Sequence, residues 1–127
     1  MFKQDWTEKQ IEAIGDTLAV AIFGKKKLKD ILEDYDENHE KDEIDGLEEK
    51  TLRVTINKFL DNDDINRAEN ILFSSIKRNP SVGKLLIAFD FYNKINEWSN
   101  EDLEKNNFSR EEIKDGIENI KRVYDKI

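Results

Sequence analysis

The stretch that decides the fold runs from residue 47 to residue 92 and reads LEEKTLRVTINKFLDNDDINRAENILFSSIKRNPSVGKLLIAFDFY. Its apolar residues recur every three or four positions, which is the period of an amphipathic helix. The acidic run Asp61-Asn62-Asp63-Asp64 interrupts the pattern and offers an N-cap to the segment that follows. Pro80 ends this second segment, because proline cannot continue a helix. The stretch therefore predicts two helices joined by a short acidic turn, with a third helix beginning after Pro80.

The residues before this stretch predict a long first helix, over residues 5–32. Asp5 and Glu8 have the spacing of a capping box, in which each side chain bonds the other residue's backbone N–H. Apolar residues then recur at alternating steps of three and four, interrupted by Lys25; they are Ile11, Ile14, Leu18, Ala21, Leu28 and Leu32. This is a heptad seam, typical of a helix that pairs with its copy in a second chain or folds into a hairpin. Gly24 is a candidate break in the helix, because glycine weakens helices.

The net charge of −8 is concentrated in one segment of the chain. Residues 33–50 hold ten acidic residues and two lysines, so nearly all of the excess lies there. Apolar side chains almost vanish over residues 33–45, and repulsion between like charges favours an exposed linker. We therefore expect a single domain in three parts: a long N-terminal helix (1–32), an acidic linker (33–45) and a helical bundle (46–127).

The segments after Pro80 complete an all-α prediction. A helix follows over about residues 81–98, because apolar residues continue at helical spacing. Ser99 caps a short fifth segment, and Ser109 with Glu112 forms a second capping box before a last helix. No segment alternates apolar and polar residues as a half-buried strand would. The whole pattern predicts a long N-terminal helix followed by a multi-helix bundle.

The composition excludes several kinds of active site. The chain has no cysteine, which rules out disulfides and thiolate chemistry. Its one histidine, His39, is too few for a carboxylate–histidine metal cluster and has no partners for a triad. An EF-hand spacing occurs over residues 34–45, but His39 stands where that loop requires glycine. We therefore expect no catalytic residues, no metal site and no cofactor.

Charge and hydropathy narrow the choice of partner and compartment. The main basic cluster, residues 25–27 with Lys29, is followed almost at once by the acidic segment, so we expect no nucleic-acid binding. No run approaches the roughly 20 apolar residues that cross a bilayer, and the first residues lack a signal-peptide pattern. Glu12 and Asp16 argue against stable membrane association of the first helix. These observations predict a cytoplasmic protein.

Two sets of residues are candidates for binding a ligand. Arg53 and Asn57 lie one helical turn apart, so a guanidinium and an amide could together hold the carboxylate of a peptide. The alternative is a pocket for a small molecule, with walls from the aromatic residues Phe73, Phe89, Phe91, Tyr92 and Trp98. Aromatic residues at helical spacing form a core more often than a pocket, so the aromatic pocket is the weaker hypothesis.

The central pair of predicted helices resembles one tetratricopeptide unit. The matching positions are Leu52, Phe59, Ala68, Leu72, Ser75 and Pro80. Leu52 and Ile56 stand where that pattern has tryptophan and glycine. The resemblance implies a helical hairpin that binds other proteins and needs neighbouring helices to cover its faces. It also places Ala88 where the next repeat would complete a carboxylate clamp, so the clamp around Arg53 is half present.

The chain as a whole resembles an uncharacterised bacterial family of short helical proteins. The segments that carry the resemblance are Met1-Phe2, Gln4-Asp5-Trp6, Gln10-Ile11-Glu12, Gly24-Lys25-Lys26, Asp64-Ile65-Asn66, Ala68-Glu69-Asn70, Phe91-Tyr92 and residues 107–112. None of them is a catalytic signature. The resemblance implies an all-helical fold and a bacterial cytosolic origin, and it transfers no functional residues.

The function we favour from the sequence is a non-enzymatic protein–protein interaction or scaffold protein. The heptad seam predicts a homodimer through residues 5–32, and the seam is equally able to meet another protein. The alternative is a small regulatory or ligand-sensing domain that binds a small molecule in an aromatic-lined pocket. No feature of the sequence identifies the partner or the ligand.

Overall fold

The computed structural model describes residues 18–38 and 43–126, and helices dominate this part of the chain. The helices are α2 (Leu18–Phe23), α3 (Lys25–Asn38), α4 (Glu43–Asp61), α5 (Ile65–Arg78), α6 (Val82–Asn96), α7 (Asn100–Lys105) and α8 (Arg110–Asp125). No strand occurs among the described residues. The all-α prediction is therefore confirmed.

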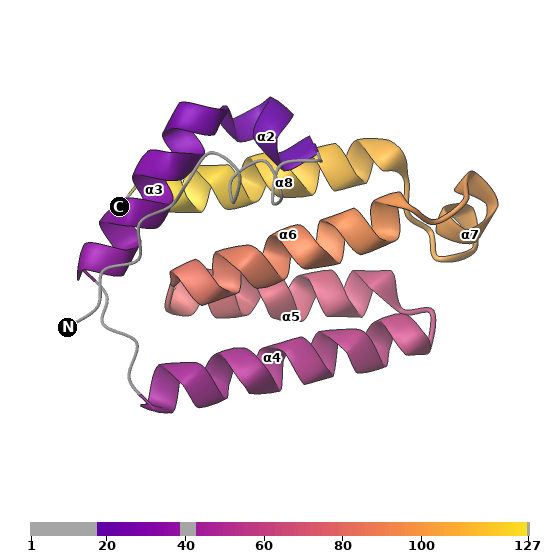
Figure 1. The fold of residues 1–127 in the computed structure, drawn as a ribbon. Helices are drawn as coiled ribbons and strands as arrows, with labels where there is room; N and C mark the ends of the chain where they lie inside the picture. Colours follow the sequence, from indigo (N-terminus) through magenta and orange to yellow (C-terminus); the bar gives the residue numbers. More distant parts are fainter. Residues whose placement is uncertain (1–17, 39–42, 127) are drawn as a thin grey trace.

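Four longer helices run back and forth beside one another (Figure 1). Helix α4 packs against α5, α6 contacts both of them, and α8 packs against α6 on the side remote from α4. Helix α2 lies against α8, α3 touches α6, and the short α7 joins α6 to α8 at one end. Every one of these helices except α2 and α7 is at least 14 residues long. The shared core takes fully buried side chains from distant parts of the chain, among them Leu28, Ile56, Leu72, Leu85 and Ile113.

Local capping determines where the helices begin. The side chain of Asp64 accepts a hydrogen bond from the backbone N–H of Arg67, as the acidic turn predicts. Ser109 and Glu112 form the complete capping box, with both reciprocal bonds at 3.2 Å. The backbone at Asp63 has a φ of 55°, which closes the turn between α4 and α5. In each cap the donor and the acceptor lie within four residues of each other, so the sequence alone predicts where these helices begin.

The described part of the predicted first helix is divided into two helices. Gly24 has a φ of +83°, a left-handed conformation that favours glycine, and it separates α2 from α3. Helix α3 then continues to Asn38, so part of the expected acidic linker is helical. Lys29 and Glu33 lie one turn apart at its centre, a spacing that favours a helix between opposite charges. The expected helix over residues 5–17 lies outside the described residues.

The predicted seam is used, in part, within the chain itself. Leu28 is fully buried in the core, so it cannot contribute to a contact with a second copy. Phe23 packs edge-on against Phe89 of α6, with 5.5 Å between ring centroids. Ala21 is exposed. Of the other predicted positions, Ile11 and Ile14 lie outside the described residues, as do the side chains of Leu18 and Leu32.

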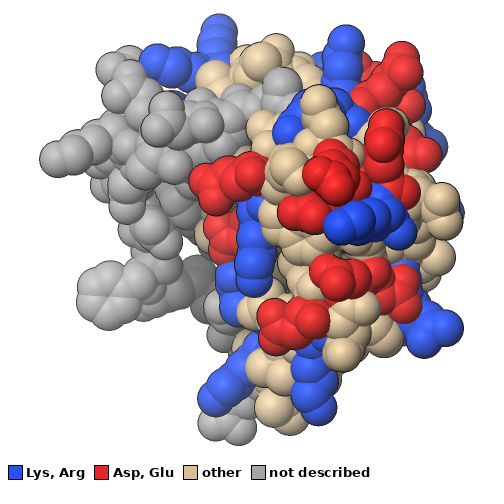
Figure 2. All heavy atoms as spheres, turned by 90° about the vertical axis from the view of Figure 1, so that its right-hand side faces the viewer, with Lys and Arg blue, Asp and Glu red and all other residues tan. Residues whose placement is uncertain are grey.

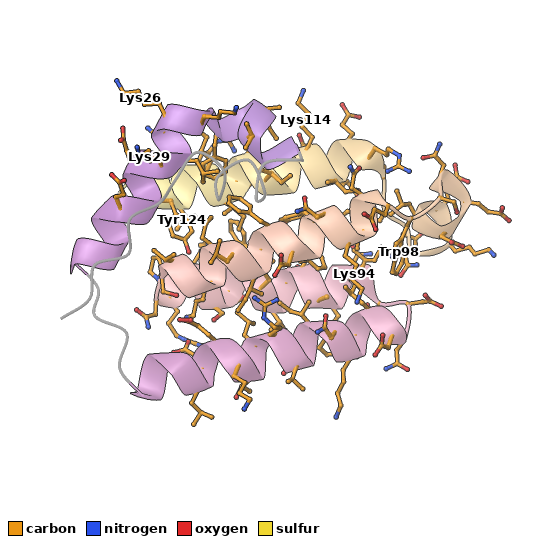
Figure 3. The ribbon with its side chains drawn as sticks, in the orientation of Figure 1. Lys26, Lys29, Lys94, Trp98, Lys114 and Tyr124 are labelled. Carbon is orange, nitrogen blue, oxygen red and sulfur yellow. The ribbon has the colours of Figure 1, made fainter. Side chains whose placement is uncertain are left out.

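The last helix is bonded to two segments that lie far from it in the sequence. Tyr124 points into the bundle in Figure 3, and its hydroxyl donates to the carbonyl of Ser81 at 2.6 Å. Lys27 of α3 forms an ion pair with Asp125 at 2.9 Å. The labelled Lys26 side chain instead projects away from the bundle (Figure 3). None of the helices among the described residues is long and apolar enough to cross a membrane.

Candidate functional site

A groove runs along the outer side of the α4–α5 hairpin, with a volume of about 630 Å³. We call it the α4–α5 groove, and it is lined by Leu47, Glu48, Thr51, Leu52, Thr55, Arg67, Asn70, Ile71, Ser74, Ser75 and Arg78. This volume lies within the range of sites that hold drug-sized ligands. We take the α4–α5 groove as the candidate site of this molecule.

Helical spacing explains why the groove exists. Residues 47, 51 and 55 stand one turn apart on α4, and residues 67, 71, 74 and 78 follow one face of α5. Thr51, Thr55 and Ser74 have short side chains, so the walls leave room between the two helices. The apolar side chain of Leu47 is 67% exposed at one end of the groove. An exposed leucine beside a hollow with an apolar floor is typical of a surface that binds another molecule.

An arginine stands at each end of the groove. Arg67 is 69% exposed, with its Nε 3.5 Å from a carboxylate oxygen of Asp64 and its guanidinium over the ring of Phe59. Arg78 is 71% exposed, and one of its nitrogens lies 3.2 Å from Glu48. A guanidinium has five N–H donors, so both arginines keep donors for a further acceptor.

A buried lysine supports the wall of the groove from below. Lys84 of α6 is 1% exposed, and its Nζ donates to Glu48 at 2.6 Å and to the carbonyl of Ser75 at 3.1 Å. The hydrogen bond from Lys84, helped by that from Arg78, holds the pKa of the Glu48 carboxyl below its usual range. The Glu48 carboxylate therefore links α4 to α5 and α6 through its ion pairs with Arg78 and Lys84.

A second, smaller pocket of about 330 Å³ lies between α5, α6 and α8. We call it the acid–aromatic pocket, and it is lined by Asn66, Glu69, Asn70, Phe73, Tyr92, Phe108, Glu112, Asp115, Gly116 and Asn119. The hydroxyl of Tyr92 donates to Glu69 at 2.7 Å. Burial raises the pKa of Glu69, and this effect outweighs the opposing hydrogen bond from Tyr92. Burial also raises the pKa of Tyr92, so its phenol stays protonated.

The two residues predicted to hold a peptide carboxylate do not line the α4–α5 groove. A nitrogen of Arg53 lies 2.7 Å from a carboxylate oxygen of Asp90 on α6, so Arg53 has a carboxylate partner in its own chain. Asn57 is exposed on the same helix. Ala88, the position where a second repeat would complete the clamp, is fully buried. The binding of a peptide carboxylate by Arg53 and Asn57 stays a prediction.

The predicted aromatic pocket is only partly assembled. Phe89, Phe91 and Tyr92 are buried in the core, and Phe73 and Trp98 pack against it. Of this set only Phe73 and Tyr92 line the acid–aromatic pocket, which Phe108 completes. Most of the aromatic residues therefore serve the core, as their helical spacing suggests.

Sequence reasoning missed the α4–α5 groove, although a signal for it was present. Thr51 and Thr55 are one turn apart on α4, and Ser74 is a small residue on the partner helix. Short side chains that face each other across two antiparallel helices predict a hollow. The exposure of Leu47 depends on how α4 packs, and its apolar character alone does not reveal it.

No group of three histidine, cysteine, aspartate or glutamate residues in the described part of the chain could hold a metal ion. The positions that resemble the start of an EF-hand, Asp34, Asp36 and Asn38, lie within helix α3 and not in a loop. On the face shown in Figure 2, acidic and basic side chains are interspersed.

Comparison with known proteins identifies the family of the chain. A family model described as a family of unknown function (DUF6483) matches residues 1–125. This match agrees with the resemblance to an uncharacterised family of short helical proteins that the sequence motifs carry. No curated protein and no solved structure gives a significant match.

Proposed function

We propose that this chain, which belongs to the family of unknown function DUF6483, is a non-enzymatic protein-interaction protein that holds a segment of a partner in the α4–α5 groove. The observation that carries the proposal is the groove itself. It has an apolar floor, small polar walls and an exposed leucine at one end. Such a combination suits a bound protein segment, because apolar area supplies affinity and a polar rim supplies orientation.

The chemistry of the lining favours binding over catalysis. Its hydroxyl groups, on Thr51, Thr55, Ser74 and Ser75, stand among lining residues that include no histidine. Its one carboxylate, Glu48, is bonded to Lys84 and Arg78, and its lowered pKa makes it a weak general base at neutral pH. A hydroxyl without a base to activate it is a poor nucleophile. The lining therefore supports a binding role.

The proposal is tested by photo-crosslinking in the cells that make the protein. A photo-reactive amino acid at position 51 lies in the groove, and one at position 54 lies on the same helix outside the groove. Val54 is 54% exposed, so both positions are reachable by a partner. We expect a discrete adduct with another protein from position 51 and none from position 54. Equal labelling from both positions, or no adduct from position 51, contradicts the proposal.

The acid–aromatic pocket favours a second candidate function, the binding of a small organic cation. Its three carboxylates, on Glu69, Glu112 and Asp115, stand beside aromatic rings, and both groups attract a cation. A thermal-shift screen with primary and quaternary amines tests this candidate. A ligand at about 100 times its dissociation constant adds about 2.7 kcal/mol to the free energy of unfolding. A shift that persists in Glu112→Gln would count against binding at this pocket.

Self-association remains part of the proposal in a narrower form. Leu28 belongs to the core, so a second copy would meet the exposed side of α2 that Ala21 marks. Light scattering across a dilution series tests this contact separately from the groove.

A further inference from the structure

We propose that the partner segment in the α4–α5 groove is an amphipathic α-helix with an acidic residue near each end, one for Arg67 and one for Arg78. This inference rests on the proposed function and narrows it to one class of partner. It is carried by the shape of the groove, by the chemistry of its lining and by the spacing of the two arginines.

The shape of the groove selects a helix over other peptide conformations. A peptide that binds as an added strand needs a sheet edge, and the described part of this chain contains no strand. A polyproline helix needs an aromatic-lined groove, and the lining of the α4–α5 groove contains no aromatic residue. Two antiparallel helices instead present parallel ridges with a furrow between them, into which the ridge of a third helix packs.

The partner helix would sit opposite α6. Helix α6 contacts both α4 and α5, so it covers the inner side of the hairpin. The groove opens on the outer side, where Leu47 is exposed. A third helix there would bury Leu47 together with the apolar floor formed by Leu52 and Ile71. Such a partner needs a stripe of apolar residues at helical spacing.

The spacing of the arginines sets the length of the partner. Arg67 and Arg78 are both on α5 and are eleven residues apart in the sequence, which corresponds to about 16 Å along the helix. A partner helix that lies along α5 needs about three turns to place one carboxylate beside each arginine. Its two acidic residues therefore lie on the same flank of its apolar stripe.

The charge of the lining selects acidic residues on the partner. The lining holds two arginines and one glutamate, so its formal charge is +1, although the whole chain carries −8. Glu48 is bonded to the buried Lys84 as well as to Arg78, so its single negative charge is shared between two cations. Carboxylates on the partner would add charge-assisted hydrogen bonds at both ends of the groove.

The test uses the full-length protein and two synthetic helical peptides, measured by fluorescence anisotropy. Both peptides are stapled and carry leucines at i, i+4 and i+7. The first has glutamates about three turns apart on one flank of the leucine stripe, and the second has lysines there. We expect the glutamate peptide to bind the wild-type protein more tightly than the lysine peptide, with a preference that shrinks as salt is raised.

Charge reversal in the protein makes the test specific to the arginines. We expect Arg67→Glu and Arg78→Glu each to weaken the glutamate peptide about threefold, and the double variant about tenfold. The double variant should in turn prefer the lysine peptide. Arg122→Glu on α8 is the matched control, because Arg122 is exposed and does not line the groove. If the double reversal does not fold, the variant Arg67→Gln with Arg78→Gln should lose the preference between the peptides.

The results separate this inference from the proposed function. Equal affinity of the two peptides for the wild-type protein, or failure of both to bind, overturns the inference. Loss of preference in Arg122→Glu as well as in the groove variants also overturns it. A partner crosslinked from position 51 would leave the proposed function standing in each of these cases. Absence of that crosslink removes the proposed function and the inference together.

Discussion

Lys84 shows how one side chain can be buried with its charge and still stabilise the fold. It is 1% exposed, and its Nζ donates hydrogen bonds to Glu48 and to the carbonyl of Ser75. A buried charge is tolerated when it is paired and hydrogen-bonded, and it becomes costly when one partner is removed. The structure therefore predicts that the two members of this pair will respond differently to substitution.

We expect Glu48→Gln to lower the free energy of unfolding at pH 7 by about 2 kcal/mol, because it leaves the charge of Lys84 buried without a counterion. Lys84→Met should cost less, because it removes the buried charge while Glu48 keeps Arg78. Chemical denaturation of the two variants, with Arg122→Gln as an exposed control, measures the difference. A larger loss in Lys84→Met would contradict this account of the pair.

The pKa of Glu48 also gives the pair a predicted pH dependence. The pKa is lowered in the folded state, so the unfolded state binds more protons as the pH falls. The stabilisation is complete above the unfolded pKa of about 4.3 and is lost as the pH falls through the lower, folded value. The difference between wild type and Glu48→Gln should therefore shrink below about pH 4. A difference that stays constant to lower pH would show that the charge of Glu48 is not its source.

At the scale of helices, Gly24 decides how the first part of the chain is divided. Its positive φ ends α2 and allows α3 to begin in a new direction, and a Cβ added there would meet no atom within 4 Å. Gly24→Ala should therefore cost about 1–2 kcal/mol through backbone strain alone. Gly24→Asn should cost less, because asparagine tolerates the left-handed region. Equal losses in the two variants, measured by denaturation, would mean that the backbone at Gly24 is not the reason.

Gly116 is required for a different reason, the close approach of α8 to α6. A Cβ at position 116 would overlap the phenol of Tyr92, whose hydroxyl is bonded to Glu69. The ring of Tyr92 is buried and cannot move freely, so Gly116→Ala should cost about 1–3 kcal/mol. The variant Gly116→Ala with Tyr92→Phe should recover part of this loss, because it removes the overlapping oxygen. No recovery in the double variant would contradict a clash at the hydroxyl.

The same scale shows what the sequence could and could not predict. The caps at Asp64 and Ser109 were predictable, because each depends on groups within four residues. Gly24 was visible as a weak point, but the heptad pattern favoured one continuous helix, and burial of Leu28 in the core explains that pattern equally well. The pairing of Arg53 with Asp90 spans 37 positions, so no local pattern reveals it. The groove likewise depends on which faces of α4 and α5 meet.

At the scale of the whole molecule, the predicted dimer depends on the exposed surface of α2. Part of the apolar seam is used inside the chain, and Ala21 on α2 is exposed. We expect the full-length protein to be a dimer by light scattering across a dilution series, and Ala21→Glu to convert it to a monomer with an unchanged helical circular dichroism spectrum. Lys26→Glu, on exposed residue 26 of the next helix, is the control. A wild-type protein that is monomeric at every concentration shows the dimer prediction to be wrong.

The packing of α2 on α8, together with the ion pair between Lys27 and Asp125, has a consequence for the synthesis of the protein. A chain leaves the ribosome from its amino end, and domains begin to fold as they emerge. Here α2 is made before its packing partner α8. The side of α2 that packs on α8 therefore stays uncovered until α8 has been translated. A ribosome stalled before residue 110 would carry a nascent chain that cannot close, which makes this protein a candidate client of ribosome-bound chaperones.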